Sequence, residues 1–159
     1  RAMVNAFQNS GLESKAYCSP IHTKPPEILD WFLRFFSTKN NAVSVGFKDA
    51  LFQGLAEDGG LYMPETIPHL GTDFFQSNLS YSECAVGMIH PFTKDDLTLA
   101  QLSDICELAF DFPIPIKKLN ETDSVLELFH GPTLAFKDFA ARFMARTMSH
   151  FLENENKEK

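Results

Sequence analysis

One stretch of the chain decides its class of fold: Leu126-Glu-Leu-Phe-His-Gly-Pro-Thr-Leu-Ala-Phe-Lys-Asp-Phe-Ala-Ala-Arg-Phe-Met144. The apolar run at residues 125–129 predicts a short buried strand, and Gly131-Pro132 breaks it. Apolar residues then recur at helical spacing from about residue 135 to residue 152. A strand, a tight loop and a long helix in this order are typical of α/β proteins, which bind ligands where strands end and helices begin.

Lys137 lies in the first turn of this predicted helix, among the apolar residues Leu134, Ala135, Phe136 and Phe139. Burial in such surroundings would favour the neutral amine over the ammonium form. A neutral amine attacks an aldehyde to form a Schiff base. The alternative is a surface lysine whose stem covers the helix while its amine reaches water, and the local pattern leaves both interpretations open.

Three further polar residues flank the loop. His130 could contact a substrate or cofactor, or could simply be a hydrogen-bonded histidine at the end of a strand. Thr133 suits the N-cap of the following helix. Asp138 suits the positive end of the helix dipole, and a catalytic role for it is the competing interpretation.

Composition excludes several classes of function. The chain has 159 residues, a formal net charge of −7 and no basic run, which argues against binding to nucleic acid or to anionic membranes. Its length fits about one domain, and no segment is apolar for long enough to span a bilayer. The widely spaced Cys18, Cys84 and Cys106 form neither a zinc site nor a disulfide framework. We therefore expect reduced thiols, a cytoplasmic location and no metal.

Two capping boxes predict the best-defined helices. Ser80-Tyr-Ser-Glu83 should begin a helix that runs to about Ile89 and ends at Pro91. Thr98-Leu-Ala-Gln101 should begin a second helix. Its apolar spacing predicts four buried residues, Leu102, Ile105, Cys106 and Ala109.

The residues before these helices predict shorter elements. A strand is expected at 35–38, a helix capped by Ser44 and ended by Gly54, a turn at 58–60 and an extended segment at 61–65. A helix at 1–9 and a strand at 12–18 are expected near the start, and the charged residues 153–159 are expected to be a solvated tail.

Leu126 to Met144 resembles the cofactor-lysine segment of the threonine synthase family. A second set of segments, Phe35-Phe-Ser-Thr38, Val45-Gly-Phe-Lys-Asp-Ala-Leu51 and Gly54-Leu-Ala-Glu-Asp-Gly-Gly-Leu-Tyr-Met-Pro64, resembles the N-terminal domain of the same family in order and spacing. The resemblance covers about residues 35–159. Ala140-Ala141 stands where some members have Gly-Gly, a change that favours the helix.

The resemblance implies an α/β fold: the N-terminal part of a fold-type II pyridoxal-phosphate enzyme, with a small helical domain and the start of the cofactor domain. It implies that Lys137 is both the catalytic and the cofactor-binding residue, holding pyridoxal phosphate as a Schiff base. It also implies the reaction of a lyase in threonine biosynthesis, which converts O-phosphohomoserine and water to threonine and phosphate. The implied partner is a small-molecule substrate, and the state of oligomerisation is left open.

The chain departs from the family pattern because it stops after the lysine helix. The Gly-rich loop that cradles the cofactor phosphate in the family is not in the sequence. Lys137 should then be more exposed, and we expect the 159-residue chain to be inactive by itself. The implied domains are 35–115 for the N-terminal domain and 116–159 for a truncated start of the cofactor domain.

Residues 1–30 resemble a different family, the carboxyl end of homoserine kinase. The residues that carry this are Ala2-Met-Val-Asn-Ala-Phe7, Gly11-Leu-Glu-Ser-Lys-Ala-Tyr-Cys-Ser-Pro-Ile21 and Glu27-Ile-Leu-Asp30. We interpret 1–34 as a kinase-like tail and a joint at Trp31–Arg34, with a regulatory extension as the competing interpretation. For the whole chain, the alternative to an enzyme is a non-catalytic, threonine synthase-like interaction protein.

Overall fold

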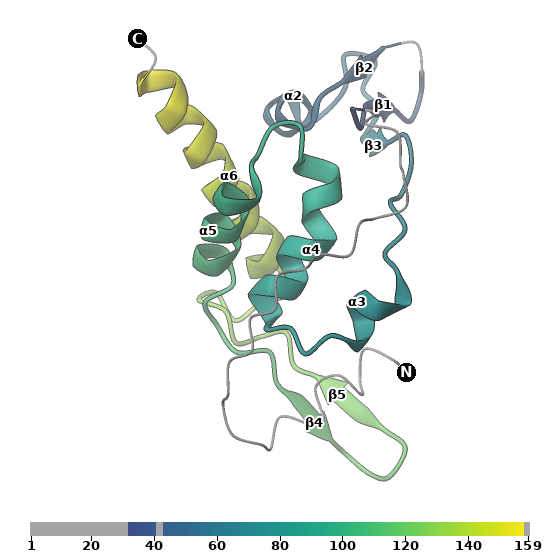
Figure 1. Ribbon diagram of the computed structural model, residues 1–159, viewed down its shortest axis with the longest axis vertical. Helices are drawn as coiled ribbons and strands as arrows, with labels where there is room; N and C mark the ends of the chain where they lie inside the picture. The colour runs from purple at the N-terminus through teal and green to yellow at the C-terminus, as the bar shows by residue number, and fades with distance from the viewer. Residues whose placement is uncertain (1–31, 41–42, 158–159) are drawn as a thin grey trace. The chain divides into compact units, whose positions relative to one another are not determined.

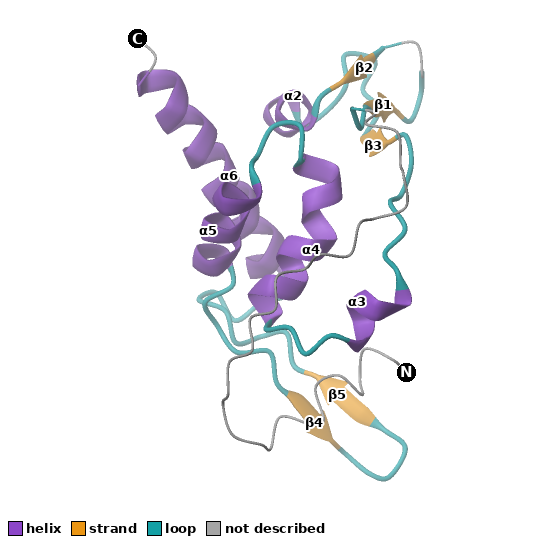
Figure 2. Ribbon diagram, viewed as in Figure 1, coloured by secondary structure: helices purple, strands orange, loops and turns teal. Residues whose placement is uncertain are grey.

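The computed structural model describes residues 32–40 and 43–157. The predicted helix at 1–9 and the predicted strand at 12–18 lie outside these residues, as does Cys18. Leu33–His69 and Leu79–Lys159 form one compact unit. Leu70–Asn78, which carries the short helix α3 (Thr72–Gln76), belongs to a separate unit. Figure 1 and Figure 2 label the helices and strands.

A small antiparallel sheet has the strand order β2-β1-β3. Its centre is β1 (Phe35–Ser37), where Phe35 lies opposite Val45 of β2 (Ser44–Val45) and opposite Pro64 of β3 (Tyr62–Pro64). The turn predicted at 58–60 is confirmed, and Gly59 adopts a φ of 73° that favours glycine. The Ser37 hydroxyl donates to Asp58 at 2.7 Å, so the turn is tied to the central strand.

Helix α2 (Phe47–Gln53) ends at Gly54 as predicted, but the prediction that Ser44 caps it is wrong. Ser44 belongs to strand β2, and Gly46 occupies the N-cap without a side-chain hydrogen bond. The acceptor comes from far along the chain, because the Lys48 N–H donates to Asp96 Oδ2 at 3.1 Å. The Asp96 carboxylate therefore accepts a hydrogen bond from the first turn of α2, the role that we had predicted for Ser44.

Helix α4 (Tyr81–Thr93) begins with the predicted capping box but does not end at Pro91. Pro91 lies inside the helix, where it has no N–H to donate to the preceding turn. Thr93 is almost fully buried, and its carbonyl accepts from the Leu97 N–H at 2.8 Å. We infer that the packing of Thr93 and Leu97 in the interior offsets the backbone hydrogen bond that Pro91 cannot make. The helix therefore continues past Pro91 to Thr93.

Helix α5 (Leu99–Ala109) confirms both its capping box and its four predicted buried residues. It packs against α4 and against α6 (Lys137–Lys157). The core is formed by the buried residues Ala85, Leu97, Leu102, Ile105, Cys106 and Phe151. Burial raises the pKa of Cys106 to about 11, and both Cys106 and Cys84 are free thiols.

The strand predicted at 125–129 forms as β5 (Ser124–Leu126), but it is exposed rather than buried. It pairs with an unpredicted strand, β4 (Ile116–Lys118), in a two-stranded antiparallel hairpin. The Asn120 side chain shapes the turn by accepting from the N–H groups of Thr122 and Asp123. The prediction of burial fails because no described element covers the faces of this hairpin.

Helix α6 begins at Lys137, two residues later than expected, and continues to Lys157. The prediction that the helix ends near Leu152 is therefore wrong, although Glu153 and Glu155 in the predicted solvated tail are exposed. Glu155 forms a 2.8 Å ion pair with Lys48 of α2, which extends the contact between these two helices. No helix of the described residues is long and apolar enough to cross a membrane.

Candidate functional site

Lys137 is the first residue of α6 and follows the loop that leaves β5. Its side chain is exposed and lines an open pocket of about 600 Å³. The pocket wall is almost wholly apolar and includes Ile114, Leu126, Leu128, Phe136 and Met144. Lys137 is thus exposed, as we expected, and its catalytic role stays a prediction.

An aromatic cluster packs against the first turns of α6, and two of its rings, Tyr81 and Phe139, also line the pocket beside Lys137. The Phe139 ring lies 5.0 Å from that of Phe112 and 6.1 Å from that of Tyr81. One turn later, Phe143 stacks on Phe110 with 6.2 Å between ring centroids. Burial raises the pKa of Tyr81 to about 12, so its hydroxyl stays protonated near neutral pH. These rings hold the start of α6 in place, while the Lys137 side chain stays exposed at the pocket.

Thr133 and Asp138 are joined, but not in the way that the sequence predicted. Thr133 does not cap α6, which begins four residues later. Instead, the Asp138 carboxylate accepts from the Thr133 N–H at 2.8 Å and from the Thr133 hydroxyl at 2.6 Å. The Thr133 hydroxyl is the main cause that lowers the pKa of Asp138 below its ordinary value. The carboxylate therefore ties the loop to the helix.

His130 has a local partner. Its Nε2 lies 2.7 Å from Glu127 Oε2, and its ring stacks on the neighbouring Phe129. This geometry supports the hydrogen-bonded histidine that was one of the two interpretations, but His130 lies four residues beyond the end of β5. Nothing in the pairing directs His130 towards Lys137.

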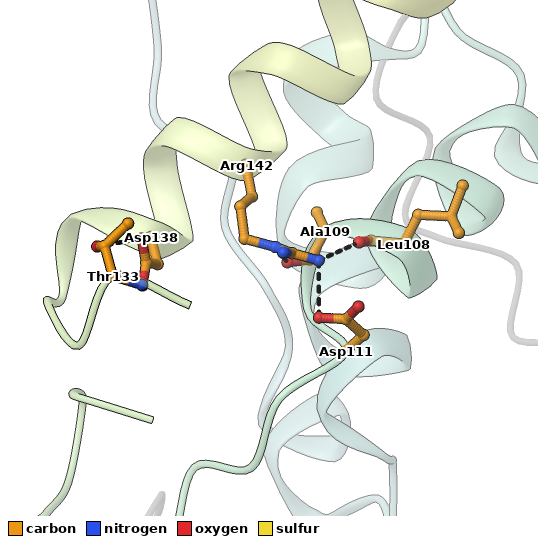
Figure 3. A network of polar contacts seen from close by, with 6 residues as sticks. All are labelled: Leu108, Ala109, Asp111, Thr133, Asp138 and Arg142. Carbon is orange, nitrogen blue, oxygen red and sulfur yellow. Dashed lines mark hydrogen bonds and ion pairs between the residues drawn. The ribbon is translucent and has the colours of Figure 1, made fainter. Parts of the chain in front are cut away.

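Arg142 is the residue that sequence reasoning missed. Its Nε donates to the Ala109 carbonyl at 2.7 Å, and its Nη2 donates to the Leu108 carbonyl at 2.8 Å and to Asp111 at 2.7 Å (Figure 3). These carbonyls end α5, so a cation on α6 satisfies the terminus of the neighbouring helix. No local pattern announces this contact, because its partners lie more than thirty residues away.

The comparisons agree with the motifs that carry the resemblance. Residues 34–110 match a family model described as "Threonine synthase N terminus". A threonine synthase from Pseudomonas aeruginosa is 41% identical over 127 residues, which cover 76% of this chain and 27% of the relative. One from Haemophilus influenzae is 38% identical over 74% of this chain and 28% of its own length.

Solved structures give the same result. A threonine synthase from Brucella melitensis, solved with bound PLP, has a TM-score of 0.73 and 37% identity, covering 78% of this chain and 28% of its own. The enzyme from Escherichia coli has a TM-score of 0.71 and 34% identity, covering 74% of this chain and 28% of its own. The predicted fold class is confirmed: the described residues have the mixed helix and strand fold expected for the N-terminal part of a fold-type II pyridoxal-phosphate enzyme.

The chain spans only 27–28% of the length of these relatives. The predicted division into 35–115 and 116–159 is not tested by these likenesses and stays a prediction. Residues 1–30 precede the family match, and their resemblance to homoserine kinase is not supported by the comparisons.

Proposed function

We propose that this chain is the N-terminal part of a threonine synthase, a pyridoxal-phosphate-dependent lyase. The complete protein would convert O-phosphohomoserine and water to threonine and phosphate. The observation that carries the proposal is Lys137, which lies at the start of a helix and beside an open apolar pocket. The chain around it is 41% identical to a threonine synthase over 127 residues.

The residues present fit one end of pyridoxal phosphate. Lys137 supplies the primary amine that the aldehyde of the cofactor requires, and the pocket beside it is apolar enough for an aromatic ring. The Gly-rich loop expected to hold the phosphate is not in this sequence. The chain therefore carries the residue that anchors the cofactor but not the whole of its site.

When bound, pyridoxal phosphate supplies an electron sink for carbanion chemistry. Within this chain, Lys137 Nζ would hold the cofactor, and the same amine would move protons during the reaction. The apolar wall of Ile114, Leu126 and Leu128 would keep water from the reacting atoms once the rest of the protein covers it.

The exposed apolar surface around Lys137 indicates that another part of the complete protein covers it. Leu126, Leu128, Phe129, Leu134, Phe136 and Met144 are all exposed. A patch of this kind marks a surface that another element buries. We propose that the downstream part of the full-length polypeptide buries it and that the 159-residue chain alone forms no threonine.

The test uses the full-length polypeptide that carries this sequence. Threonine and phosphate should form from O-phosphohomoserine, and Lys137→Ala should abolish both the absorbance band of the bound cofactor and the reaction. Lys118→Ala, which removes an exposed lysine of β4, is the matched control and should leave both intact. A full-length protein that binds no cofactor through Lys137 would instead be the non-catalytic interaction protein. Threonine formed by the 159-residue chain would overturn its predicted inactivity.

We propose further that residues 1–30 are the end of a homoserine kinase, joined to the synthase part at Trp31–Arg34. The family match begins at residue 34, which supports a joint at this place. We interpret this joint as the tail of one gene product fused by accident to the head of the next. Sequencing the parent locus tests this interpretation: two separate reading frames that meet here would support it, and an uninterrupted full-length kinase and synthase reading frame would contradict it. The free thiols Cys84 and Cys106 support a cytoplasmic location for the complete enzyme.

A further inference from the structure

Asp138 is a buried carboxylate directly after Lys137. Only 4% of it is exposed, and both of its oxygens accept hydrogen bonds from Thr133 (Figure 3). The two residues close a short ring of backbone around the loop that enters α6. The carboxylate thus joins the last part of the loop to the first turn of the helix.

The loop has a shape that needs such a tie. Leu134 has a φ of 58°, a left-handed conformation that leucine adopts at a cost, and its side chain is 74% exposed. Its N–H donates to the Gly131 carbonyl at 3.0 Å. Since an exposed leucine gains nothing by packing there, the hydrogen bonds of the loop must hold this conformation.

Gly131 receives Asp138 from the other side. A Cβ on Gly131 would lie 2.3 Å from Asp138 Oδ2 and 2.7 Å from Asp138 Cβ, which is too close for non-bonded atoms. Only glycine lets the backbone lie against the carboxylate here. Asp138 is therefore enclosed between Gly131 and Thr133, and its position sets that of the loop.

The same helix is fixed one turn later by Arg142, which binds the end of α5. Neighbouring residues of a helix point about 100° apart, so Asp138 can face the loop while Lys137 faces the pocket. Asp138 locates the start of α6 relative to the loop, and Arg142 locates α6 relative to α5. Lys137 directly precedes Asp138, so it lies next to the first of these attachments.

We propose that Asp138 is a positioning residue: by clamping Thr133 and Gly131 it fixes where the Lys137 backbone stands at the edge of the pocket. This inference rests on the proposed function of Lys137. A shift of about 1 Å in a reacting group is enough to slow a reaction about a hundredfold, which is why the support of such groups matters. The competing role is stabilisation of the helix dipole alone, which would change stability without changing the reactivity of Lys137.

The first measurement is hydrogen exchange on the 159-residue chain. Asp138→Asn should accelerate exchange of the Thr133 amide at least about tenfold, because an amide group is a weaker acceptor than a carboxylate. The amides of Leu102 and Ile105 in the core should not change. Asp104→Asn, which neutralises an exposed carboxylate on α5, is the matched control and should change neither. Unchanged exchange at Thr133 in Asp138→Asn would overturn the clamp.

The second measurement follows Lys137 itself in the full-length protein. Pyridoxal phosphate is added, the adduct is reduced with borohydride, and the peptide containing Lys137 is quantified by mass spectrometry over time. Asp138→Asn should slow adduct formation about 10- to 100-fold, with the urea midpoint of unfolding nearly unchanged. A wild-type rate in Asp138→Asn would overturn the positioning role.

A pair of variants keeps the test decisive if Asp138→Asn fails to fold. Thr133→Ser retains both hydrogen bonds to Asp138 and should react at the wild-type rate, whereas Thr133→Val loses the hydroxyl and should react more slowly. Equal rates in the pair would overturn the inference. Adduct formation that Lys137→Ala leaves unchanged would instead refute the proposed function, so the two failures are distinguishable.

Discussion

Apolar residues are buried in the helical core of α4, α5 and α6 but exposed in the β4–β5 hairpin. In the core, Leu102 is 0% exposed and lies among residues of all three helices. In the hairpin, Leu126 is 52% exposed although it occupies a strand. Both positions hold a leucine. The core is completed by residues within the chain, whereas the hairpin and the lysine loop lack a covering layer among the described residues.

The largest difference should appear on truncating one leucine in each region. Leu102→Ala should lower the free energy of unfolding by about 2–5 kcal/mol, because it leaves a cavity in a closed core. Leu126→Ala should lower it by about 0.5 kcal/mol or less, because the side chain is already half in water. Urea unfolding of the 159-residue chain measures both. Equal losses would mean that the hairpin is as well packed as the core.

The attachment of α6 to α5 should be the next largest effect. Arg142→Met should destabilise the chain by about 1–3 kcal/mol, since two carbonyls at the end of α5 lose their charged donor. Asp111→Asn is the control, because Asp111 is the exposed partner and its loss should cost less than about 1 kcal/mol. An Arg142→Met variant as stable as the wild type would show that packing alone holds the lysine helix in place.

The capping box of α4 should contribute less. Ser80→Ala should cost about 1 kcal/mol in urea unfolding, because the Glu83 N–H loses its acceptor. Hydrogen bonds from Ser80 hold the pKa of Glu83 below its ordinary value of 4.5. The folded-state pKa is depressed, so this contribution is fully present above pH 4.5 and is lost as the pH falls through the folded-state value. The gap between the wild type and Ser80→Ala should therefore narrow below pH 4.5, and a constant gap would contradict it.

The smallest effect on stability should come from the exposed side of α6. Phe136 is 67% exposed, so Phe136→Ser should change the free energy of unfolding by no more than about 0.5 kcal/mol. It should nevertheless reduce the fluorescence of a bound apolar dye such as ANS, since Phe136 lines the open pocket. Ile67→Ser removes an exposed apolar residue outside the pocket and is the control for dye binding. Equal dye binding in the two variants would place the dye elsewhere.

Most helices were predictable because their signals are local. The boxes at Ser80–Glu83 and Thr98–Gln101 close between residues three apart, so no knowledge of the fold is required to see them. The end of α4 was not predictable, since Pro91 reads as a stop until the burial of Thr93 is known. The same holds for the hairpin, because an apolar run does not reveal whether anything covers it.

Some features of the candidate site were also predictable from the sequence, and others were not. Its central residue, Lys137, and its position at the start of a helix after a strand and loop follow from the order of residues along the chain. The hydrogen bonds from Thr133 to the Asp138 carboxylate do not follow from that order. A threonine before a helix and an aspartate in its first turn each suggest separate local roles, and only the close approach of Gly131 brings them into one cluster.

By itself, then, the sequence determined the helices with closed capping boxes, because these depend on contacts within a few residues. The class of fold and the choice of Lys137 as the candidate residue came from motifs that resemble the threonine synthase family. The tertiary structure alone decided that Asp96 caps α2, that Arg142 ends α5 and that the wall beside Lys137 stays open. Each of these depends on groups from distant parts of the chain meeting, or failing to meet, at an unsatisfied backbone terminus or an apolar face. The periodicity of a sequence does not reveal which distant residues come into contact.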